Sequence, residues 1–173
     1  PDRRGSLSTR TTHPAFLEGI VGVLGNVGAH STIHNPFADS TKGEMFAMAA
    51  ELVGTDEASG FLSRTHSCGL TGQRAFGISL TTQCGVCFGC VVRRASFKAA
   101  DVDDQSIYID RGLSPRDDSW LDRNSVERTM RSFLRRGVTT VYLASMSLPA
   151  GYTAGLAAEL CNRGCKELEG YFA

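Results

Sequence analysis

The hydrophobic pattern of the amino-terminal part predicts a helix followed by a short strand. Apolar residues recur at three- and four-residue intervals after Pro14, which is typical of an amphipathic helix over residues 13–28. Glycines at positions 19, 22 and 25 weaken this helix, because glycine has a low helix propensity. Residues 30–37 are then predicted to form a strand that ends at Pro36.

A capping box predicts the start of a second helix. Thr41 and Glu44 have the spacing at which the threonine side chain accepts from the glutamate N–H while the glutamate side chain reaches back. Apolar residues continue at helical spacing to Val53. Residues 54–83 are rich in Gly, Ser and Thr and are predicted to be one long loop, which needs an anchor in a compact domain.

The carboxy-terminal half contains a change of composition that suggests a domain boundary. Residues 87–100 are expected to be helical, and residues 106–110 to form a strand or an extended segment. A Ser-Pro pair followed by two acidic residues then indicates a linker. The predicted regions are therefore an α/β part over residues 1–110 and a helical extension over residues 111–173.

The pattern within the extension predicts further helices. Apolar residues from Trp120 to Leu134 share one helical face, and Glu127 and Arg131 form an i,i+4 pair on its polar side. Residues 138–148 fit either a strand or a helix.

The last apolar stripe runs from Leu156 to Phe172 at helical spacing. Cys161 and Cys165 belong to this stripe, so they are interpreted as core residues. Tyr171 and Phe172 lie at the end of the chain, where little sequence remains to cover them. The extension is therefore a possible surface for a protein partner, and docking of these rings on the chain's own body is the alternative.

Charge and hydropathy exclude two classes of function. The chain has 18 basic and 18 acidic residues and a formal net charge of zero, which argues against a nucleic-acid partner because phosphate neutralisation needs excess cations. No apolar run approaches the roughly 20 residues of a membrane helix, and no signal-peptide pattern opens the chain. We therefore expect a soluble, cytoplasmic protein without a membrane partner. Because it begins with Pro1 and a polar stretch, we also expect it to be part of a larger protein.

The cysteine spacing carries the strongest chemical signal. Cys84, Cys87 and Cys90 have the pattern C-x-x-C-x-x-C, and a loop can return Cys68 as a fourth thiolate. Four sulfur ligands are typical of a structural zinc site with no open coordination position. Each short spacing contains a glycine, as a tight turn around a metal requires.

Three other interpretations of these cysteines are weaker. A redox C-x-x-C motif leaves the third and fourth cysteines unexplained. A disulfide framework suits short secreted chains, whereas 173 residues with 42% hydrophobic content can bury a core without crosslinks. Iron–sulfur ligation uses similar spacings and stays open as the main alternative to zinc.

The segments around the cysteines resemble the zinc region of QueC-type 7-cyano-7-deazaguanine synthases. Residues 65–68 (T-H-S-C) and 84–97 (C-G-V-C-F-G-C-V-V-R-R-A-S-F) match that family's cysteine, gap and C-G-x-C-x-x-C, with an arginine and an aromatic residue after it. Residues 41–44 (T-K-G-E) resemble its Thr-Lys-x-Glu helix start, and residues 8–10 (S-T-R) more loosely an arginine-containing turn. The resemblance covers about residues 6–110.

The resemblance implies a fold, an activity and cofactors. The fold is a doubly wound α/β nucleotide-binding domain of the PP-loop ATPase class. The activity is that of a carbon–nitrogen ligase, in which ATP with Mg²⁺ adenylates a carboxylate of a 7-deazaguanine substrate before amide and nitrile formation. Zinc is structural in this scheme, because four thiolates leave no position for substrate.

The sequence also departs from the family. The Ser-Gly-Gly-x-Asp-Ser loop that holds pyrophosphate is absent from the chain, and the nearest fragment is Ser59-Gly60. We expect this loop on an upstream segment, which would then be a partner of the chain. The long extension resembles QueC-like proteins of bacterial anti-phage gene clusters, the QatC type, and this resemblance also implies a protein partner.

Four cations are candidate residues for binding the cofactor or an anionic substrate, and the catalytic residues are not identified. Arg10 and Lys42 are taken from the resemblance and, for Lys42, from its unfavourable place in the first turn of a helix. Arg93 and Arg94 follow the last cysteine on the same predicted helix. Surface roles are the alternative for each of them.

The four histidines are weaker candidates. His13, His30 and His34 are interpreted as structural or solvated. His66 lies two residues before Cys68 and is a candidate hydrogen-bond donor to a metal-bound thiolate.

Two functions of different classes therefore follow from the sequence. One is part of an ATP-dependent QueC-like enzyme, in queuosine biosynthesis or in defence. The other is a non-catalytic, zinc-stabilised interaction module that binds a protein partner through its helical extension.

Overall fold

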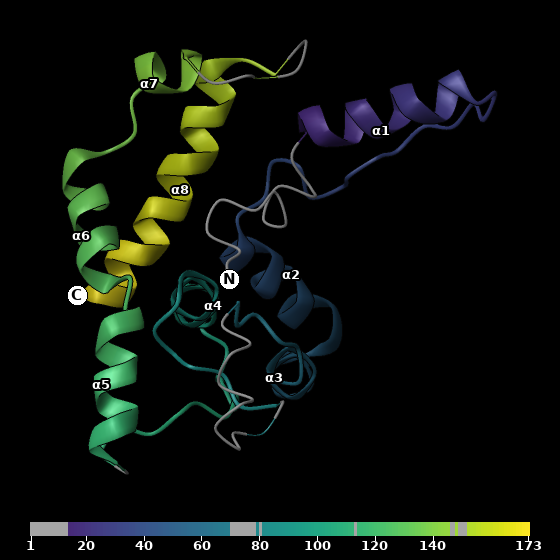
Figure 1. The fold of residues 1–173 in the computed structure, drawn as a ribbon. Coiled ribbons are helices and arrows are strands. Elements are labelled where there is room, and N and C mark those ends of the chain that lie inside the picture. Colours follow the sequence, from purple (N-terminus) through teal and green to yellow (C-terminus); the bar gives the residue numbers. More distant parts are fainter. Residues whose placement is uncertain (1–13, 70–78, 80, 113, 146–147, 149–151) are drawn as a thin grey trace. The chain divides into compact units, whose positions relative to one another are not determined.

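The regular structure of the chain is helical in the part that a computed structural model describes, namely residues 14–69, 79, 81–112, 114–145, 148 and 152–173 (Figure 1). The helices are α1 (Pro14–Asn26), α2 (Lys42–Val53), α3 (Thr55–Ser63), α4 (Phe88–Ala99), α5 (Pro115–Asn124), α6 (Glu127–Arg136), α7 (Thr140–Ala144) and α8 (Ala154–Phe172). Among these residues, the one β pairing is an isolated parallel bridge between Gln83 and Tyr108. None of the described helices combines the length and the apolar character that crossing a bilayer requires.

Several predicted helices have the expected bounds because their signals are local. The capping box of α2 is complete: the Glu44 N–H donates to Thr41 Oγ1 (3.1 Å), and the Thr41 N–H donates to the Glu44 carboxylate (2.8 Å). Cys87 is the N-cap of α4. Helices α1 and α8 coincide with the predicted apolar stripes.

The predicted strand over residues 30–37 is wrong. The described residues contain no second segment that pairs with it, and most of its side chains are exposed. Asn35 starts a turn instead, in which its side-chain Oδ1 accepts from the Phe37 N–H (3.1 Å) and its carbonyl accepts from the Ala38 N–H (3.2 Å). Pro36 occupies the second turn position, where its fixed backbone angle is favourable.

The predicted long loop over residues 54–83 is partly wrong, because α3 occupies its first third. Asp56 and Glu57 lie in the first turn of α3, where carboxylates interact favourably with the helix dipole. Ala58 and Leu62 are spaced i,i+4 and are both buried. Burial of this face outweighs the glycine and serine content that suggested a loop.

The predicted linker is a helix start rather than a flexible connection. Ser114 is the N-cap of α5, with its Oγ accepting from the Asp117 N–H (3.1 Å), and Pro115 is in the first turn. The single helix expected from Trp120 to Leu134 is two helices. It breaks where the Val126 N–H donates to the Val86 carbonyl (3.1 Å), a tertiary contact that the local pattern does not reveal.

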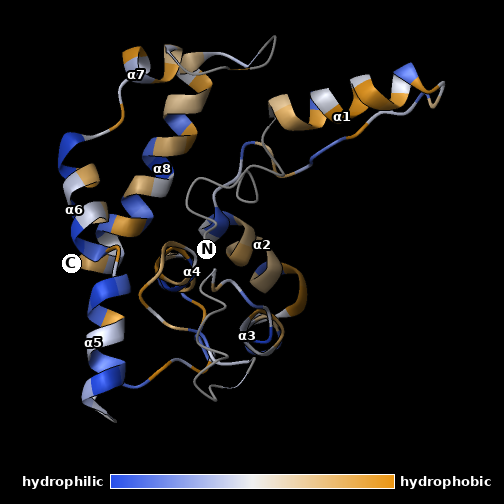
Figure 2. Ribbon diagram, in the orientation of Figure 1, coloured by the Kyte–Doolittle hydropathy of each residue, from blue (hydrophilic) through white to orange (hydrophobic). Residues whose placement is uncertain are grey.

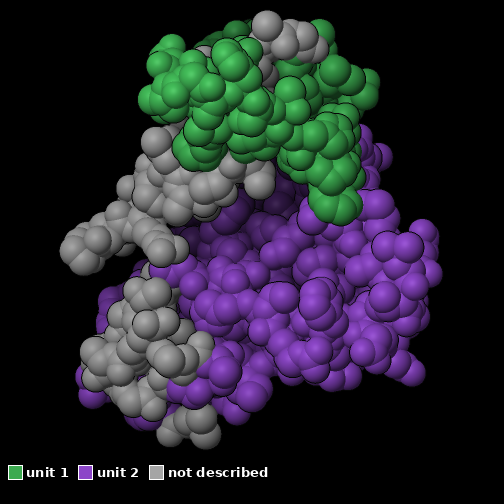
Figure 3. Space-filling view, turned by 90° about the vertical axis from the view of Figure 1, so that its right-hand side faces the viewer, with its two compact units in different colours: residues 1–40, 138–162 green, residues 41–137, 163–173 purple. Residues whose placement is uncertain are grey.

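The chain divides into two compact units, which Figure 3 colours separately. The first, here the terminal unit, comprises Pro1–Ser40 and Val138–Asn162, and the second, here the cysteine unit, comprises Thr41–Gly137 and Arg163–Ala173. Helix α8 contributes residues to both units. The predicted domain boundary at residue 110 stays a prediction.

Each unit has its own buried cluster or clusters. The terminal unit has a small one, formed by Leu143, Ala157 and Ala158. The cysteine unit has two. The aromatic cluster contains Phe46, Ala58, Leu62, Phe97 and Val102, and the cysteine cluster contains Cys68, Cys84, Cys87, Cys90 and Leu121. Helix α2 packs against both α3 and α4, which places the aromatic cluster between these helices.

Candidate metal centre

Four cysteine side chains meet at the beginning of α4. Cys68 follows α3, Cys84 precedes α4, Cys87 is the N-cap of α4 and Cys90 lies in its first turn. All four are buried, and their Sγ atoms lie within 4.8 Å of one another. The group could therefore hold a metal ion, and it consists of the four residues that the sequence spacing predicts.

The sulfur spacing fits a single ion. The Sγ–Sγ distance is 3.8 Å between Cys84 and Cys90 and 3.9 Å between Cys87 and Cys68. Zn–S bonds of about 2.3 Å give a tetrahedron with edges of about 3.8 Å. A four-iron cluster holds its thiolates on its outer corners, so its sulfurs are farther apart. The arrangement favours one tetrahedral ion with four sulfur ligands and no water.

Two glycines make the turn around the sulfurs possible. Gly85 has a φ of 77°, a left-handed conformation that side chains rarely adopt. A methyl group at Gly89 would overlap the carbonyl oxygen of Ser67, so the segment that carries Cys68 can pass only against a glycine. The Cys87 N–H donates to Cys84 Sγ (3.3 Å), an N–H···S contact that stabilises a thiolate.

The four thiols share their protons unequally because they are in hydrogen-bond contact. The hydrogen bond with Cys84 lowers the pKa of Cys68 to about 7. The contact with Cys68 lowers the pKa of Cys87 and raises the pKa of Cys84 and of Cys90. Four thiolates at this distance would repel one another, and a bound metal ion removes this repulsion. Metal binding therefore favours deprotonation of the four cysteines.

Gln83 connects the cysteine segments to one another. It is almost fully buried, and its side-chain Oε1 accepts from the Ser67 N–H (3.1 Å), next to Cys68. Its backbone pairs with the segment after α4, where Gln83 N–H donates to Ile107 O (2.8 Å) and Ile109 N–H donates to Gln83 O (2.9 Å). This residue therefore holds the Cys68 segment in register with Cys84.

Arg93 is a fully buried cation on α4, one turn after Cys90. Its guanidinium donates to Ser106 Oγ (2.8 and 3.1 Å), to Thr65 Oγ1 (2.7 Å) and to the Leu62 carbonyl (2.6 Å). It also lies over the Phe97 ring, 5.0 Å from the centroid. Arg93 was a candidate for contacting a substrate, and the structure instead places it inside the protein, where it joins α3, α4 and the segment after α4.

Lys42 is half-buried at the first position of α2. Its Nζ donates to Ser67 Oγ (3.1 Å) and lies 5.6 Å from the Phe46 ring centroid. Burial lowers the pKa of Lys42, repulsion from Arg93 lowers it further, and Cys90 opposes these effects. In the described part of the chain, no carboxylate forms an ion pair with Lys42 or Arg93.

The remaining candidate residues lie apart from the sulfurs. Arg94 is exposed, and its guanidinium lies between the rings of Tyr108 and Tyr171, 5.1 and 5.4 Å from their centroids. Arg10 falls outside the described residues, as does His13.

The described histidines make no contact with the thiolates. The His66 ring is exposed and forms no hydrogen bond with a cysteine in the resolved ranges, so Gln83 and Ser67 are the polar neighbours of the cluster instead. His30 and His34 are exposed residues of the terminal unit.

The carboxy-terminal part of α8 is bound to the start of α2. Glu167 accepts from the Thr41 hydroxyl and from the Gly43 N–H (3.2 Å), and Arg163 pairs with Glu44 (2.7 Å). The hydrogen bond from the Thr41 N–H is the main cause of the lowered pKa of Glu44. A methyl group at Gly43 would overlap the Glu167 carboxylate, so this glycine permits the contact.

Sequence reasoning missed the polar residues that support the centre. Gln83, Ser67 and Ser106 have no motif of their own, and their roles depend on segments that meet only in the fold. The nearest available signal was the place of Gln83 directly before the three-cysteine run.

A comparison of the chain with protein-family models, with curated proteins and with solved structures gave no match.

Proposed function

We propose that the chain binds one structural zinc ion through Cys68, Cys84, Cys87 and Cys90, and that it is the zinc-bearing part of a QueC-like, ATP-dependent enzyme. The observation that carries the metal assignment is the set of four buried Sγ atoms within 4.8 Å of one another. Four thiolates with no free coordination position suit a structural ion rather than a catalytic one.

The charges around the sulfurs support a metal with four thiolates. A divalent ion with four thiolate ligands has a net charge of about −2, and buried charge requires compensation. Arg93 and Lys42 supply two positive charges near the cluster, and neither forms an ion pair with a described carboxylate. Neutral thiols would leave these cations without an opposing charge.

The zinc ion would fix the segments that border α4. It would join the segment after α3, the turn at Gly85 and the first turn of α4, whose shared buried cluster consists of the four cysteines and Leu121. Its binding free energy then becomes folding free energy.

The enzymatic part of the proposal rests on the resemblance of the motifs. A carboxylate is a poor electrophile, so adenylation by ATP would supply the leaving group that amide and nitrile formation need. In support, the Thr-Lys-Gly-Glu motif forms a capped helix start, with Lys42 close to the cysteine segment. Lys42 and Arg94 are the described cations that could meet an anionic substrate in the assembled enzyme.

A metal analysis tests the zinc assignment. Purified chain should contain about one zinc per molecule, and cobalt substitution should give the intense absorption of tetrahedral thiolate ligation. A brown protein with iron and inorganic sulfide, or a folded protein without metal, would reject it.

A product assay tests the enzymatic proposal. With ATP, Mg²⁺, ammonia and 7-carboxy-7-deazaguanine, we expect no AMP above background from the 173 residues by themselves, because the pyrophosphate loop is absent from this sequence. Joined to a segment that carries the Ser-Gly-Gly-x-Asp-Ser loop, the chain should release AMP and form the amide and nitrile. A zinc-loaded protein that stays inactive in that form would favour the interaction module.

The alternative function, an interaction module, has less support from the end of the chain. Tyr171 and Phe172 contact Arg94 and Arg131 of the same unit, and Arg131 also donates to the Phe172 carbonyl (3.2 Å). A partner that used these rings would have to displace both arginines.

A further inference from the structure

A cavity of about 550 Å³ lies on the segments that lead to Cys68 and to Cys84. Its walls are formed by the end of α3, by the extended segments over residues 65–66 and 105–107, and by Thr81. All of these belong to the cysteine unit. Pockets of this size accept cofactors and mononucleotides.

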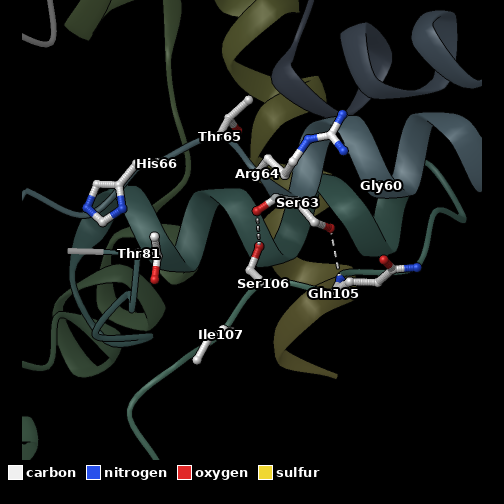
Figure 4. A pocket seen from close by; sticks show the side chains of 9 residues that line it. All are labelled: Gly60, Ser63, Arg64, Thr65, His66, Thr81, Gln105, Ser106 and Ile107. Atoms are coloured by element: carbon white, nitrogen blue, oxygen red, sulfur yellow. Dashed lines mark hydrogen bonds between the residues drawn. The ribbon is translucent and has the colours of Figure 1, made fainter. Parts of the chain in front are cut away.

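The lining offers hydrogen-bond donors and the guanidinium of Arg64. Among the residues that the structure describes, it consists of Gly60, Ser63, Arg64, Thr65, His66, Thr81, Gln105, Ser106 and Ile107, and none of these is a carboxylate. Figure 4 shows His66 and Thr81 at one end, Gln105 at the other, and Ser63 and Ser106 between them. The cavity therefore favours a ligand that accepts hydrogen bonds and carries negative charge.

Three side chains of the lining have free polar groups. In the part of the chain that the structure describes, the Arg64 guanidinium, the His66 ring and the Gln105 amide have no hydrogen-bond or ion-pair partner. The nearest acidic residue along the chain, Asp104, has both carboxylate oxygens occupied, by the Ser106 N–H (3.0 Å) and the Tyr108 hydroxyl (2.6 Å). The lining donors thus remain available to a ligand.

The inner wall of the cavity is held in place by the buried Arg93. Arg93 fixes the Ser106 and Thr65 hydroxyls, and those hydroxyls donate onward to the Ser63 carbonyl (3.3 Å) and the Leu62 carbonyl (2.8 Å). The backbone at Gln105 is also fixed, because its N–H donates to Ser63 Oγ (2.9 Å). A wall with locked rotamers loses little entropy when a ligand binds.

From this combination we infer that the cavity binds a small molecule of mononucleotide size through a carboxylate or phosphate group. The oxyanion meets the Arg64 guanidinium, and the His66 ring, the Gln105 amide and the Ser63 hydroxyl meet the polar atoms of the rest of the ligand. The inference rests in part on the proposed function, whose nucleotide and carboxylate ligands belong to this class, and it adds the residues that would bind them. It assigns a positioning role to Arg93, which holds the Thr65 and Ser106 side chains of the wall.

Binding measurements with matched ligands test the ligand class. The full chain is titrated with AMP, with adenosine, and with indole-3-carboxylate, and the backbone amide signals of His66 and Gln105 are followed by NMR. We expect AMP, indole-3-carboxylate or both to shift these signals, and AMP, where it shifts them, to bind at least about tenfold more tightly than adenosine. The oxyanion that binds identifies the source as phosphate or carboxylate. Equal binding of AMP and adenosine, or no shift by any of the three at millimolar concentration, overturns the inference.

Charge substitutions test the location. Gln105→Glu places a carboxylate in the lining at nearly constant volume, and Arg64→Gln removes a cation, so each should weaken binding by about tenfold or more. Arg128→Gln is the matched control, since Arg128 is an exposed arginine of α6 outside the lining. A loss in all three variants would indicate non-specific attraction and overturn the inference.

Metal content and thermal midpoint of each variant show whether it is folded, and the same measurements separate this inference from the metal assignment. If the protein contained no zinc but bound the ligand, and the lining substitutions weakened that binding, the cavity assignment would stand while the zinc proposal would fail. If the protein contained zinc but the lining substitutions did not change ligand binding, the zinc proposal would stand and the cavity assignment would fail.

Discussion

The aromatic cluster and the cysteine cluster lie on the same helix, α4, but are held together by different means. In the aromatic cluster, Phe46 and Phe97 pack edge to face at 4.8 Å between three helices. In the cysteine cluster, most of the backbone is turn or extended segment rather than helix. The buried atoms at its centre are four sulfurs. The first cluster can rely on apolar burial, whereas the second needs a ligand that binds sulfur.

This difference shows that burial alone does not say what stabilises a site. Cys90 and Phe97 are both almost fully buried on α4. Phe97 is buried against carbon, which needs no further partner, while Cys90 is buried against three other thiols. The two clusters should therefore respond differently to substitution and to chelation.

The largest expected effect is the loss of the cysteine cluster in Cys87→Ser. Structural zinc binding contributes an apparent free energy of about 10–16 kcal/mol in small zinc domains, so the variant should lose its metal and the folded structure around α4. Zinc content and circular dichroism measure this. Cys161→Ser is the matched control, because Cys161 lies outside the cluster and should keep the metal. A Cys87→Ser protein with one zinc and unchanged melting would contradict the comparison.

Phe97→Ala should destabilise the aromatic cluster without removing the metal. Truncation of a buried phenylalanine costs about 3–5 kcal/mol, because a cavity replaces the ring. Urea unfolding of the zinc-loaded protein measures the change, and zinc content should stay near one per chain. Leu52→Ala, at a side chain that is 84% exposed, should change the unfolding free energy little. Loss of zinc in Phe97→Ala would show that the two clusters form one unit.

Gly89→Ala separates backbone fit from helix propensity. Alanine favours a helix by up to about 1 kcal/mol over glycine, yet its methyl group at position 89 would meet the Ser67 carbonyl. We expect a net loss of about 1–3 kcal/mol, with weaker zinc binding in a chelator competition. Gly164→Ala, at a helical glycine with nothing close to its Cβ position, should be neutral or stabilising. A stabilised Gly89→Ala protein would mean that the Cys68 segment does not pass against α4.

Glu167→Gln should have the smallest effect. The variant keeps the shape of the side chain but loses the charge at the start of α2, which is worth about 1 kcal/mol in such contacts. Thermal unfolding measures the loss, and zinc content should not change. Glu169→Gln is the control, because Glu169 is exposed on the same helix. Equal effects of the two substitutions would argue against a specific contact with α2.

The sequence predicts the elements whose signals are local. The cysteine group follows from spacing, and α2 follows from the Thr41 and Glu44 pair, because each depends on residues close together in the chain. The strand over residues 30–37 fails because a strand requires a distant partner, which the described residues do not supply. Helix α3 was missed because its stability comes from burial of Ala58 and Leu62 rather than from helix propensity.

The role of each arginine could not be predicted for a similar reason. Arg93 and Arg94 are adjacent in the sequence, yet one is fully buried and the other exposed. Only the direction in which α4 packs decides between these two environments, and this direction depends on contacts with α2 and on the cysteine cluster. Charge and spacing alone could therefore identify both as candidates but could not distinguish them.

The order of the cysteines along the chain has a consequence for folding. Cys84 and Cys90 are only six residues apart, so an ion can gather the three clustered cysteines at little cost in chain entropy and start α4. Cys68 lies 19 residues before Cys87, and its arrival closes the larger loop. The three-cysteine segment is thus suited to act as the nucleus of this unit, and the fourth thiolate completes it by bringing α3 to a helix that has already formed.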